Sequence, residues 1–250
     1  MLDQNRRAPR GNEQNISYAL LGAGRTGSQI SELLHPNESL TIFDRINKPT
    51  EDLLRAHDVI ISFLPAEAFE QYIPMLITSN KPVVVGTTGG DWQQQVHTQL
   101  LQLERSWIHA KNFSLGMNLI KPLMAILSKA SDLFYESSFE IRETHHVGKL
   151  DAPSGTALSI EQWLGQDVEI SSERINDVIG EHKVIVHTPY EEITVKHKAL
   201  SRKIFAQGAL WSCRYLLSNE VPKGLVPFEY ISDQRIANLT STEGVSHDSL

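Results

Sequence analysis

Two adjacent imidazoles and an ammonium group lie in one short polar segment, at His145, His146 and Lys149. A histidine gains or releases a proton near neutral pH, and a lysine can pair with an anion. Neighbouring residues of a strand point to opposite faces, so only one of the two histidines is expected to face a ligand. A metal site is disfavoured, because the segment has no second ligand at helical spacing and Cys213 is the chain's single cysteine.

A helix start follows this segment, because Pro153 and Ser154 are typical of the first positions of a helix. The free N–H groups of Gly155 and Thr156 would then form a site for an anion. Together, the two segments indicate a pocket for an anionic substrate, most simply a carboxylate, with a proton donor beside it. Each residue alone also has an ordinary structural interpretation, and only the whole string favours chemistry.

The elements around this string alternate between strand and helix patterns. Residues 138–143 alternate in polarity and predict a strand, and apolar residues at helical spacing follow Thr156. Further on, residues 192–198 predict a strand and residues 205–217 a helix. This half of the chain therefore predicts an α/β domain with its own sheet.

The first half of the chain reads as a doubly wound parallel sheet. Its apolar runs are continuous rather than alternating, which is typical of strands that are covered on both faces. Strands are predicted at residues 18–21, 40–43, 59–64 and 83–85, with a fifth around Ile108. Helices are predicted at residues 66–78 and 92–105, and a helical stretch carrying Ile30, Leu33 and Leu34 is predicted to stop near Pro36.

A glycine-rich turn joins the first strand to this first helical stretch, Gly22-Ala23-Gly24-Arg25-Thr26-Gly27. In that context the glycines allow a tight turn, close approach of a pyrophosphate and close packing. Asp44 follows twenty residues after Gly24, where a carboxylate could accept from a ribose hydroxyl, and Arg45 could instead hold a 2′-phosphate. Although such glycines also mark ordinary turns, we predict that this turn binds a dinucleotide.

A second glycine turn follows the fourth predicted strand, Gly86-Thr87-Thr88-Gly89-Gly90. Ligands of open α/β sheets bind outside the carboxyl ends of the strands, so this turn could lie along a nicotinamide or its ribose. Taken alone, it is equally well a loop built from turn-forming residues.

Composition limits the class of protein. The 250 residues carry 23 Lys+Arg against 30 Asp+Glu, a formal charge of −7, which argues against a general nucleic-acid binder. No apolar run approaches the roughly 20 residues that cross a bilayer. We therefore expect a cytoplasmic globular protein with no membrane or nucleic-acid partner, with loose tails at residues 1–15 and 238–250.

The string around the histidines resembles the signature of the bacterial dihydrodipicolinate reductases, also called 4-hydroxy-tetrahydrodipicolinate reductases. The resemblance is carried by the run His145-His146-x-x-Lys149-x-Asp151-Ala152-Pro153-Ser154-Gly155-Thr156-Ala157. Shorter matches occur in the same order, at Gly86-Thr87-Thr88, Asn112-Phe113-Ser114-x-Gly116-x-Asn118, Gly180-Glu181-His182 and His197-Lys198-Ala199-x-Ser201-Arg202.

This resemblance implies a lysine-pathway enzyme that uses NADH or NADPH to reduce a cyclic imine dicarboxylate, with loss of water from its 4-hydroxy form. It implies proton donation by His145 with help from Lys149, and dicarboxylate binding by His146, Gly155 and Thr156. It also adds Asn112 and Phe113 to the cofactor site.

The resemblance further implies two domains and a homotetramer. The dinucleotide-binding domain would comprise residues 1–113 and 202–250, and residues 114–201 would form the substrate-binding and tetramerisation domain.

Two departures and two alternatives remain open. The glycine turn is one residue shorter than the common family form, with Thr26 in place of the usual methionine, and Asp44-Arg45 suits either NADH or NADPH. Another two-domain dehydrogenase, for example of the aspartate type, would explain the glycine turn but not residues 149–157. A regulator that kept only the fold would be expected to have lost the proton donor or the anion site.

Overall fold

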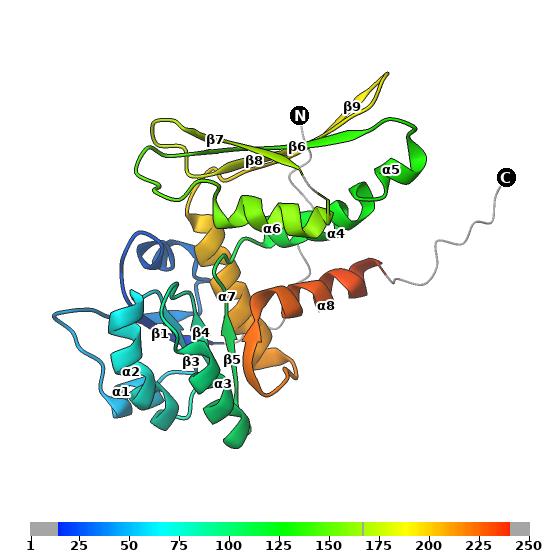
Figure 1. Ribbon diagram of the computed structural model, residues 1–250. Coiled ribbons are helices and arrows are strands. Elements are labelled where there is room, and N and C mark those ends of the chain that lie inside the picture. Colours follow the sequence, from blue (N-terminus) through cyan, green and yellow to red (C-terminus); the bar gives the residue numbers. More distant parts are fainter. Residues whose placement is uncertain (1–14, 167, 241–250) are drawn as a thin grey trace. The chain divides into compact units, whose positions relative to one another are not determined.

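The computed structural model describes residues 15–166 and 168–240, which divide into two compact units (Figure 1). The first contains Met1–Phe113 and Phe205–Phe228, and the second contains Ser114–Ile204 and Glu229–Leu250. The tail expected at residues 1–15 lies outside the described residues except for Asn15. Of the C-terminal stretch expected to be loose, residues 238–240 belong to a helix, and residues 241–250 lie outside the described part.

The first unit is built on a parallel six-stranded sheet with the order β10-β5-β4-β3-β1-β2. Every residue of the two central strands β3 and β4 is buried, which is why their sequences are continuous apolar runs. The Rossmann-type fold expected from the sequence is confirmed. The strands are β1 (Ser17–Leu21), β2 (Ser39–Phe43), β3 (Val59–Ser62), β4 (Val83–Val85), β5 (Ser106–His109) and β10 (Gly224–Pro227).

Helices connect these strands and supply the core. Helix α2 has the predicted bounds, and its Phe69 packs edge-on against Trp92 with ring centroids 4.7 Å apart. The helices of this unit are α1 (Glu51–Arg55), α2 (Ala66–Thr78), α3 (Gln93–Gln102) and α7 (Lys203–Ser218). Among the described residues, no helix is both long and apolar enough to span a membrane.

The prediction of an α-helical stretch after the glycine turn is wrong. The structure has two short 3₁₀ turns instead, η1 (Gly27–Gln29) and η2 (Ser31–Leu33). Their hydrogen bonds close over three residues, from Ile30 N–H to the Gly27 carbonyl and from Leu33 N–H to the Ile30 carbonyl, both at 3.0 Å. The few residues before Pro36 leave no room for several α-helical turns, so the apolar spacing is satisfied by a tighter coil.

The second unit is a four-stranded mixed sheet with the order β7-β6-β8-β9. Strand β7 pairs with β6 in parallel, whereas β8 pairs antiparallel with both β6 and β9. Helices α4 and α6 lie along one face and bury Met124 and Ile160 against Ile141 and Val184 (Figure 1). The elements are β6 (Ser138–His145), β7 (Glu169–Arg174), β8 (Glu181–His187), β9 (Glu192–Lys198), α4 (Leu115–Leu127), α5 (Ala130–Leu133), α6 (Gly155–Leu164) and α8 (Phe228–Thr240).

The C-terminal helix α8 differs from the expected domain division. The sequence placed all of residues 202–250 in the first domain, but from Glu229 onward α8 groups with the second unit. An ion pair ties it there, with Lys121 Nζ of α4 at 2.6 Å from Asp233 Oδ2. The two residues of this ion pair are more than a hundred positions apart in the sequence, so no local sequence pattern could predict the contact.

Candidate active site

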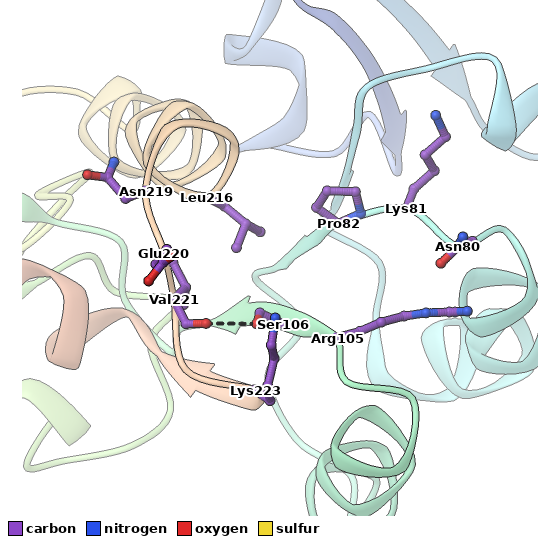
Figure 2. A pocket seen from close by; sticks show the side chains of 10 residues that line it. All are labelled: Asn80, Lys81, Pro82, Arg105, Ser106, Leu216, Asn219, Glu220, Val221 and Lys223. Carbon is purple, nitrogen blue, oxygen red and sulfur yellow. Dashed lines mark hydrogen bonds between the residues drawn. The ribbon is translucent and has the colours of Figure 1, made fainter.

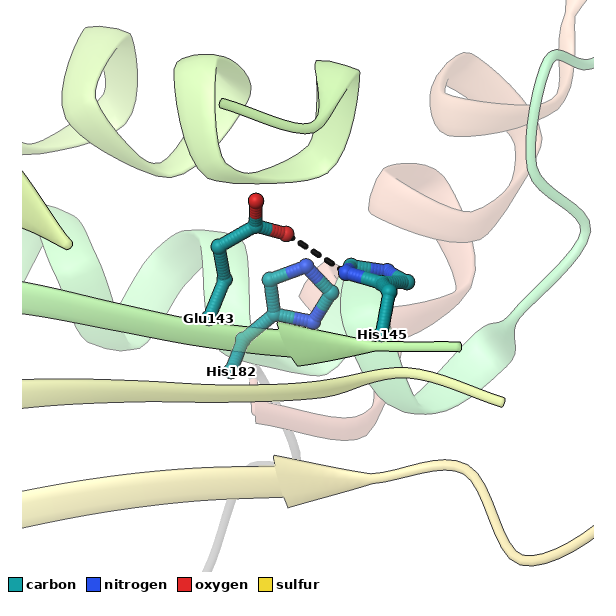
Figure 3. A group of neighbouring side chains, drawn as sticks. All are labelled: Glu143, His145 and His182. Atoms are coloured by element: carbon teal, nitrogen blue, oxygen red, sulfur yellow. Dashed lines mark ion pairs between the residues drawn. The ribbon is translucent and has the colours of Figure 1, made fainter. Parts of the chain in front are cut away.

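Strand β6 brings two chemical groups to one face of the second sheet. Glu143 and His145 are two residues apart, so both point towards the helices, and both are buried. His182 of β8 lies directly opposite Glu143 in the antiparallel register and is buried beside them. Figure 3 shows the three side chains converging on one another.

The Glu143 carboxylate is held ionised by its neighbours. Its Oε1 accepts hydrogen bonds from the Ser154 backbone N–H at 3.1 Å and from Arg174 Nη2 at 3.0 Å. Burial alone would raise the pKa of Glu143, but hydrogen bonds from Ser154, Ser172 and Arg174 outweigh burial and lower it to about 2. The group is therefore a fixed negative charge under ordinary conditions.

His145 pairs with the other oxygen of this carboxylate. Its Nδ1 lies 2.5 Å from Glu143 Oε2, as the dashed line in Figure 3 marks. Burial lowers the pKa of His145, and the negative charge of Glu143 opposes that effect. A Cβ atom at Gly180 would stand only 3.1 Å from His145 Nε2, so the ring packs closely against this glycine. A buried histidine of lowered pKa is an effective proton donor when it is charged.

His182 packs directly against His145. The two rings meet edge to face with centroids 5.1 Å apart, and His182 Nε2 lies 3.2 Å from Ser154 Oγ. Burial lowers the pKa of His182 to about 4, so this ring is neutral at pH 7. One carboxylate and two imidazoles would also suit zinc in composition. Oε1 of that carboxylate already accepts from Arg174 and from the Ser154 N–H, and the same three groups also suit proton handling.

The loop after β6 already binds a carboxylate of the chain itself. Lys149 Nζ lies 2.7 Å from both side-chain oxygens of Asp151. The pKa of Asp151 is lowered first by this hydrogen bond from Lys149, and the backbone N–H of Gly155 contributes as well. A carboxylate thus lies where an ammonium group and the start of a helix can both reach it.

Helix α6 begins as the sequence predicted. Ser154 is its N-cap, with Oγ accepting from the Ala157 N–H at 3.2 Å, and the helix runs from Gly155 to a left-handed Gly165. A side chain at Gly155 would meet nothing within 4 Å, so the space before the first turn is open. Thr156 lies in that same turn, and the N–H groups at the start of a helix suit an anion, as the contact of the Gly155 N–H with Asp151 illustrates.

His146 lies apart from this cluster. It directly follows β6, and its side chain is half-buried rather than fully enclosed. The two adjacent histidines thus differ in burial, with His145 enclosed in the cluster and His146 half-buried in the loop after the strand, as the alternation of side chains along a strand predicted. Its assignment as a substrate-binding residue stays a prediction.

The expected cofactor residues gather at the carboxyl ends of the first unit's strands. Gly22 directly follows β1 with a φ of +95°, and a side chain at Gly27 would stand 2.0 Å from the Gly22 carbonyl oxygen. A side chain at Gly24 would meet nothing within 4 Å, which leaves room for a ligand to approach the backbone. Arg25 and Thr26 complete the turn. Residues of these types and spacing fit a dinucleotide.

The acidic residue of this site follows β2. Asp44 Oδ1 accepts the backbone N–H groups of Ile46 and Asn47, both at 2.8 Å, and these bonds lower the pKa of its carboxyl. The carboxylate is exposed, as is Arg45 beside it. Both groups are therefore available to a ribose or to its phosphate.

The second glycine turn and the residues after β5 complete the same edge. Gly86 directly follows β4, and a side chain there would stand 2.4 Å from the Phe63 ring. Thr87 is buried with its hydroxyl donated to the Leu64 carbonyl at 2.9 Å, whereas Thr88 is exposed. After β5, Asn112 is half-buried and the Phe113 ring is fully buried, with Phe63 at its edge.

A separate hollow of about 560 Å³ in the first unit lies away from these residues (Figure 2). It is lined by Lys81 and Pro82 just before β4 and by Ser106 at the start of β5, whose hydroxyl donates to the Val221 carbonyl at 3.1 Å. It therefore lies at the amino ends of the strands. Since open α/β sheets bind ligands at the carboxyl ends, this hollow is not the cofactor site.

Sequence reasoning gave no role beside His145 to four residues that surround it: Glu143, Ser154 as a bridging residue, Arg174 and His182. The Glu-x-His spacing on a predicted strand could have indicated that Glu143 shares a face with His145. Nothing local could have found Arg174, because it reaches Glu143 only through the parallel pairing of β7 with β6.

The chain was compared with known proteins. Family models described as "Dihydrodipicolinate reductase, N-terminus" and "Dihydrodipicolinate reductase, C-terminus" match residues 16–113 and 116–231. It is 32% identical over 224 residues to a 4-hydroxy-tetrahydrodipicolinate reductase of Campylobacter lari, covering 79% of this chain and 91% of that protein. It is 34% identical over 163 residues to the Thermosipho africanus enzyme of the same name, covering 65% of this chain and 74% of the relative.

Solved structures show the same fold. A dipicolinate-bound dihydrodipicolinate reductase from Paenisporosarcina superposes with a TM-score of 0.70 at 23% identity, covering 87% of this chain and 100% of that one. A diaminopimelate dehydrogenase of Corynebacterium glutamicum superposes with a TM-score of 0.53 at 13% identity, over 92% and 99% of the two chains.

Proposed function

The chain belongs to the dihydrodipicolinate reductase family, and from this membership we infer that it catalyses the reduction of 4-hydroxy-tetrahydrodipicolinate by NADH or NADPH. The product is tetrahydrodipicolinate, formed with loss of water on the way to diaminopimelate and lysine. The observation in this chain that supports the assignment best is the carboxylate held by Lys149 and the start of α6, close to the buried His145–Glu143 pair.

The first unit binds the cofactor in this proposal. The turn from Gly22 to Gly27 takes the pyrophosphate, Asp44 and Arg45 face the adenosine ribose, and the turn at Gly86-Thr87-Thr88 lies along the nicotinamide side with Asn112 and Phe113. When bound, the reduced nicotinamide supplies a hydride to the ring carbon of the substrate that carried the hydroxyl. The task of the chain is to orient the substrate ring towards the nicotinamide and to exclude competing reactions.

The second unit binds the dicarboxylate. Lys149 and the N–H groups of Gly155 and Thr156 take one carboxylate in place of the Asp151 side chain, and His146 contributes from the outer side of the loop. Neutralising one carboxylate of the dianion in this way helps to orient the ring, which is the main catalytic benefit of such binding. The ammonium of Lys149 also offsets negative charge that develops near the reacting carbon.

Proton supply falls to His145. Hydride addition leaves an enamine, which becomes the product when carbon takes up one proton. The protonated His145 ring gives that proton up and becomes the neutral imidazole, for which its lowered pKa suits it. The fixed charge of Glu143 stabilises the imidazolium before the transfer.

The test is oxidation of NADH or NADPH at 340 nm, with substrate formed in place by enzymatic condensation of pyruvate and aspartate semialdehyde. We expect oxidation that requires both precursors and is inhibited by 2,6-pyridinedicarboxylate, a planar dianion of similar shape. The absence of oxidation, in a protein that still binds a reduced nucleotide, would reject this substrate. The assay also ranks the two cofactors.

We further propose a cytoplasmic homotetramer assembled through the sheets of the second unit. The face of that sheet opposite α4 and α6 carries charged residues in complementary pairs, such as Arg142 with Glu140 and Lys196 with Glu181. Light scattering should give a mass about four times the 28.1 kDa of one chain. A monomer mass at micromolar concentration would refute the assembly.

A further inference from the structure

We propose that Glu143 is the positioning residue of the proton donor His145: its carboxylate holds the ring by Nδ1 and so makes Nε2 the nitrogen that exchanges a proton with the substrate. This role rests on the proposed function, in which His145 protonates the enamine. It assigns to Glu143 a part that neither the family match nor the sequence pattern supplied.

The geometry gives each carboxylate oxygen a separate partner. Oε1 accepts from the Ser154 N–H and from Arg174, whereas Oε2 lies 2.5 Å from His145 Nδ1. An ionised carboxylate can only accept hydrogen bonds, so the facing imidazole nitrogen must carry the hydrogen. In neutral His145 this leaves Nε2 unprotonated, and that nitrogen lies against Gly180, where a Cβ atom would stand 3.1 Å away.

The carboxylate is anchored from two further elements. Arg174 comes from β7, and its guanidinium also donates to the backbone carbonyls of Lys149, at 3.2 Å, and of Asp151. Ser154 donates its N–H to Glu143 while its hydroxyl caps helix α6. Glu143 therefore links the proton donor to the loop and the helix start that are proposed to bind the substrate. Such anchoring fixes the ring within the narrow limits that proton transfer requires.

Several titratable and charged groups face His145 from the elements around it. They are Glu143 on β6, Lys149 in the following loop, Arg174 on β7, His182 on β8 and, behind His182, His197 on β9.

Only one of these groups favours the charged form of the ring. Burial, Lys149 and Arg174 all lower the pKa of His145, and Glu143 alone opposes them. His182 is neutral at pH 7 and adds no charge there. If Glu143 lost its charge, the imidazolium would persist only at lower pH, and activity that depends on it would be lost at a lower pH than in the native enzyme.

The experiment compares Glu143→Gln with Glu136→Gln as a matched control. Glu136 lies just before β6 in the same unit, and its side chain is exposed. For Glu143→Gln we expect kcat to fall by about 10²- to 10⁴-fold and the alkaline limb of the kcat profile to move to lower pH, with cofactor affinity unchanged. Glu136→Gln should match the native enzyme. A kcat within twofold of native and an unmoved limb would overturn the proposal.

A second measurement needs no turnover. The ¹⁵N chemical shifts of the His145 ring in the native protein should show a protonated Nδ1 and an unprotonated Nε2 above its pKa, and the Glu143→Gln variant should lose this preference. The opposite tautomer in the native protein would overturn the proposal even if the variant fails to fold. A native protein that shows the expected tautomer but does not reduce the substrate would instead reject the proposed function.

Discussion

The glycine turn after β1 offers a sharp test of the cofactor site, through the substitution Gly27→Ala. A Cβ atom at this position would stand 2.0 Å from the carbonyl oxygen of Gly22. Because carbon and oxygen atoms approach to no less than about 3.3 Å, the turn must open by roughly 1.3 Å to accept the methyl group. The displaced atoms belong to the turn that is proposed to hold the pyrophosphate.

The size of the effect follows from this displacement. Forcing one methyl group into a closely packed position costs about 1–3 kcal/mol. If that cost falls on the bound state, cofactor affinity drops by roughly 5- to 150-fold. If it falls on folding, the melting temperature drops by about 2–4 °C for each kcal/mol in a chain of this length. We expect both losses, because the methyl group strains the folded chain and the opened turn no longer has the shape that fits the pyrophosphate.

The matched control is Gly24→Ala, in the same turn. A Cβ atom there meets nothing within 4 Å, so the melting temperature should stay at the native value. Cofactor affinity should still fall, because the methyl group would fill the space proposed for the pyrophosphate. Fluorescence titration with NADH and NADPH measures the affinity, and calorimetry the melting temperature. Native affinity in Gly24→Ala would show that no phosphate approaches this backbone, and an unchanged melting temperature in Gly27→Ala would refute the steric reasoning.

Three further outcomes are expected. Lys149→Ala should lower kcat by about 10²-fold or more with the cofactor dissociation constant unchanged; an unaltered kcat, measured at 340 nm, would remove Lys149 from the mechanism. Arg45→Ala should weaken NADPH by roughly tenfold or more and leave NADH nearly unaffected; equal losses in the two titrations would contradict a contact with the 2′-phosphate. Glu38→Gln should destabilise the protein at pH 7 by about 3 kcal/mol, because Glu38 pairs with Arg214 through two bonds at 2.8 and 2.7 Å. Burial raises the pKa of Glu38, but its hydrogen bonds lower that pKa below the usual value. The stabilisation by Glu38 is therefore present above pH ~4.3 and is lost as the pH falls through the lowered pKa. Urea denaturation should show that the stability difference between variant and native protein shrinks towards pH 3, and a constant difference would contradict this assignment.

The sequence predicted best those helices and strands whose apolar residues form one regular, uninterrupted pattern. Helix α2 and strand β4 have the bounds that the sequence indicated, because a regular apolar period or a continuous apolar run describes each of them completely. The stretch after Gly27 was misjudged because apolar spacing does not report how many turns fit before Pro36. Helix α8 groups with the second unit from Glu229 onward, whereas the sequence placed it in the first domain, because the Lys121–Asp233 pair joins residues far apart in sequence.

The same distinction explains what the sequence showed of the site. His145, Lys149 and Gly155 lie within eleven consecutive residues, so their types and order were enough to indicate an anion pocket with a proton donor. Arg174 and His182 reach that pocket only through the pairing of β6 with β7 and β8, and pairing across a sheet leaves no mark in local spacing. A composition argument would count Arg174 as one more surface cation, whereas in the fold hydrogen bonds from Ser154, Ser172 and Arg174 together keep Glu143 ionised against the cost of burial. The chemistry of the string is therefore encoded locally, but the ionisation of Glu143, on which the proposed role of His145 depends, rests on contacts that only the folded unit brings together.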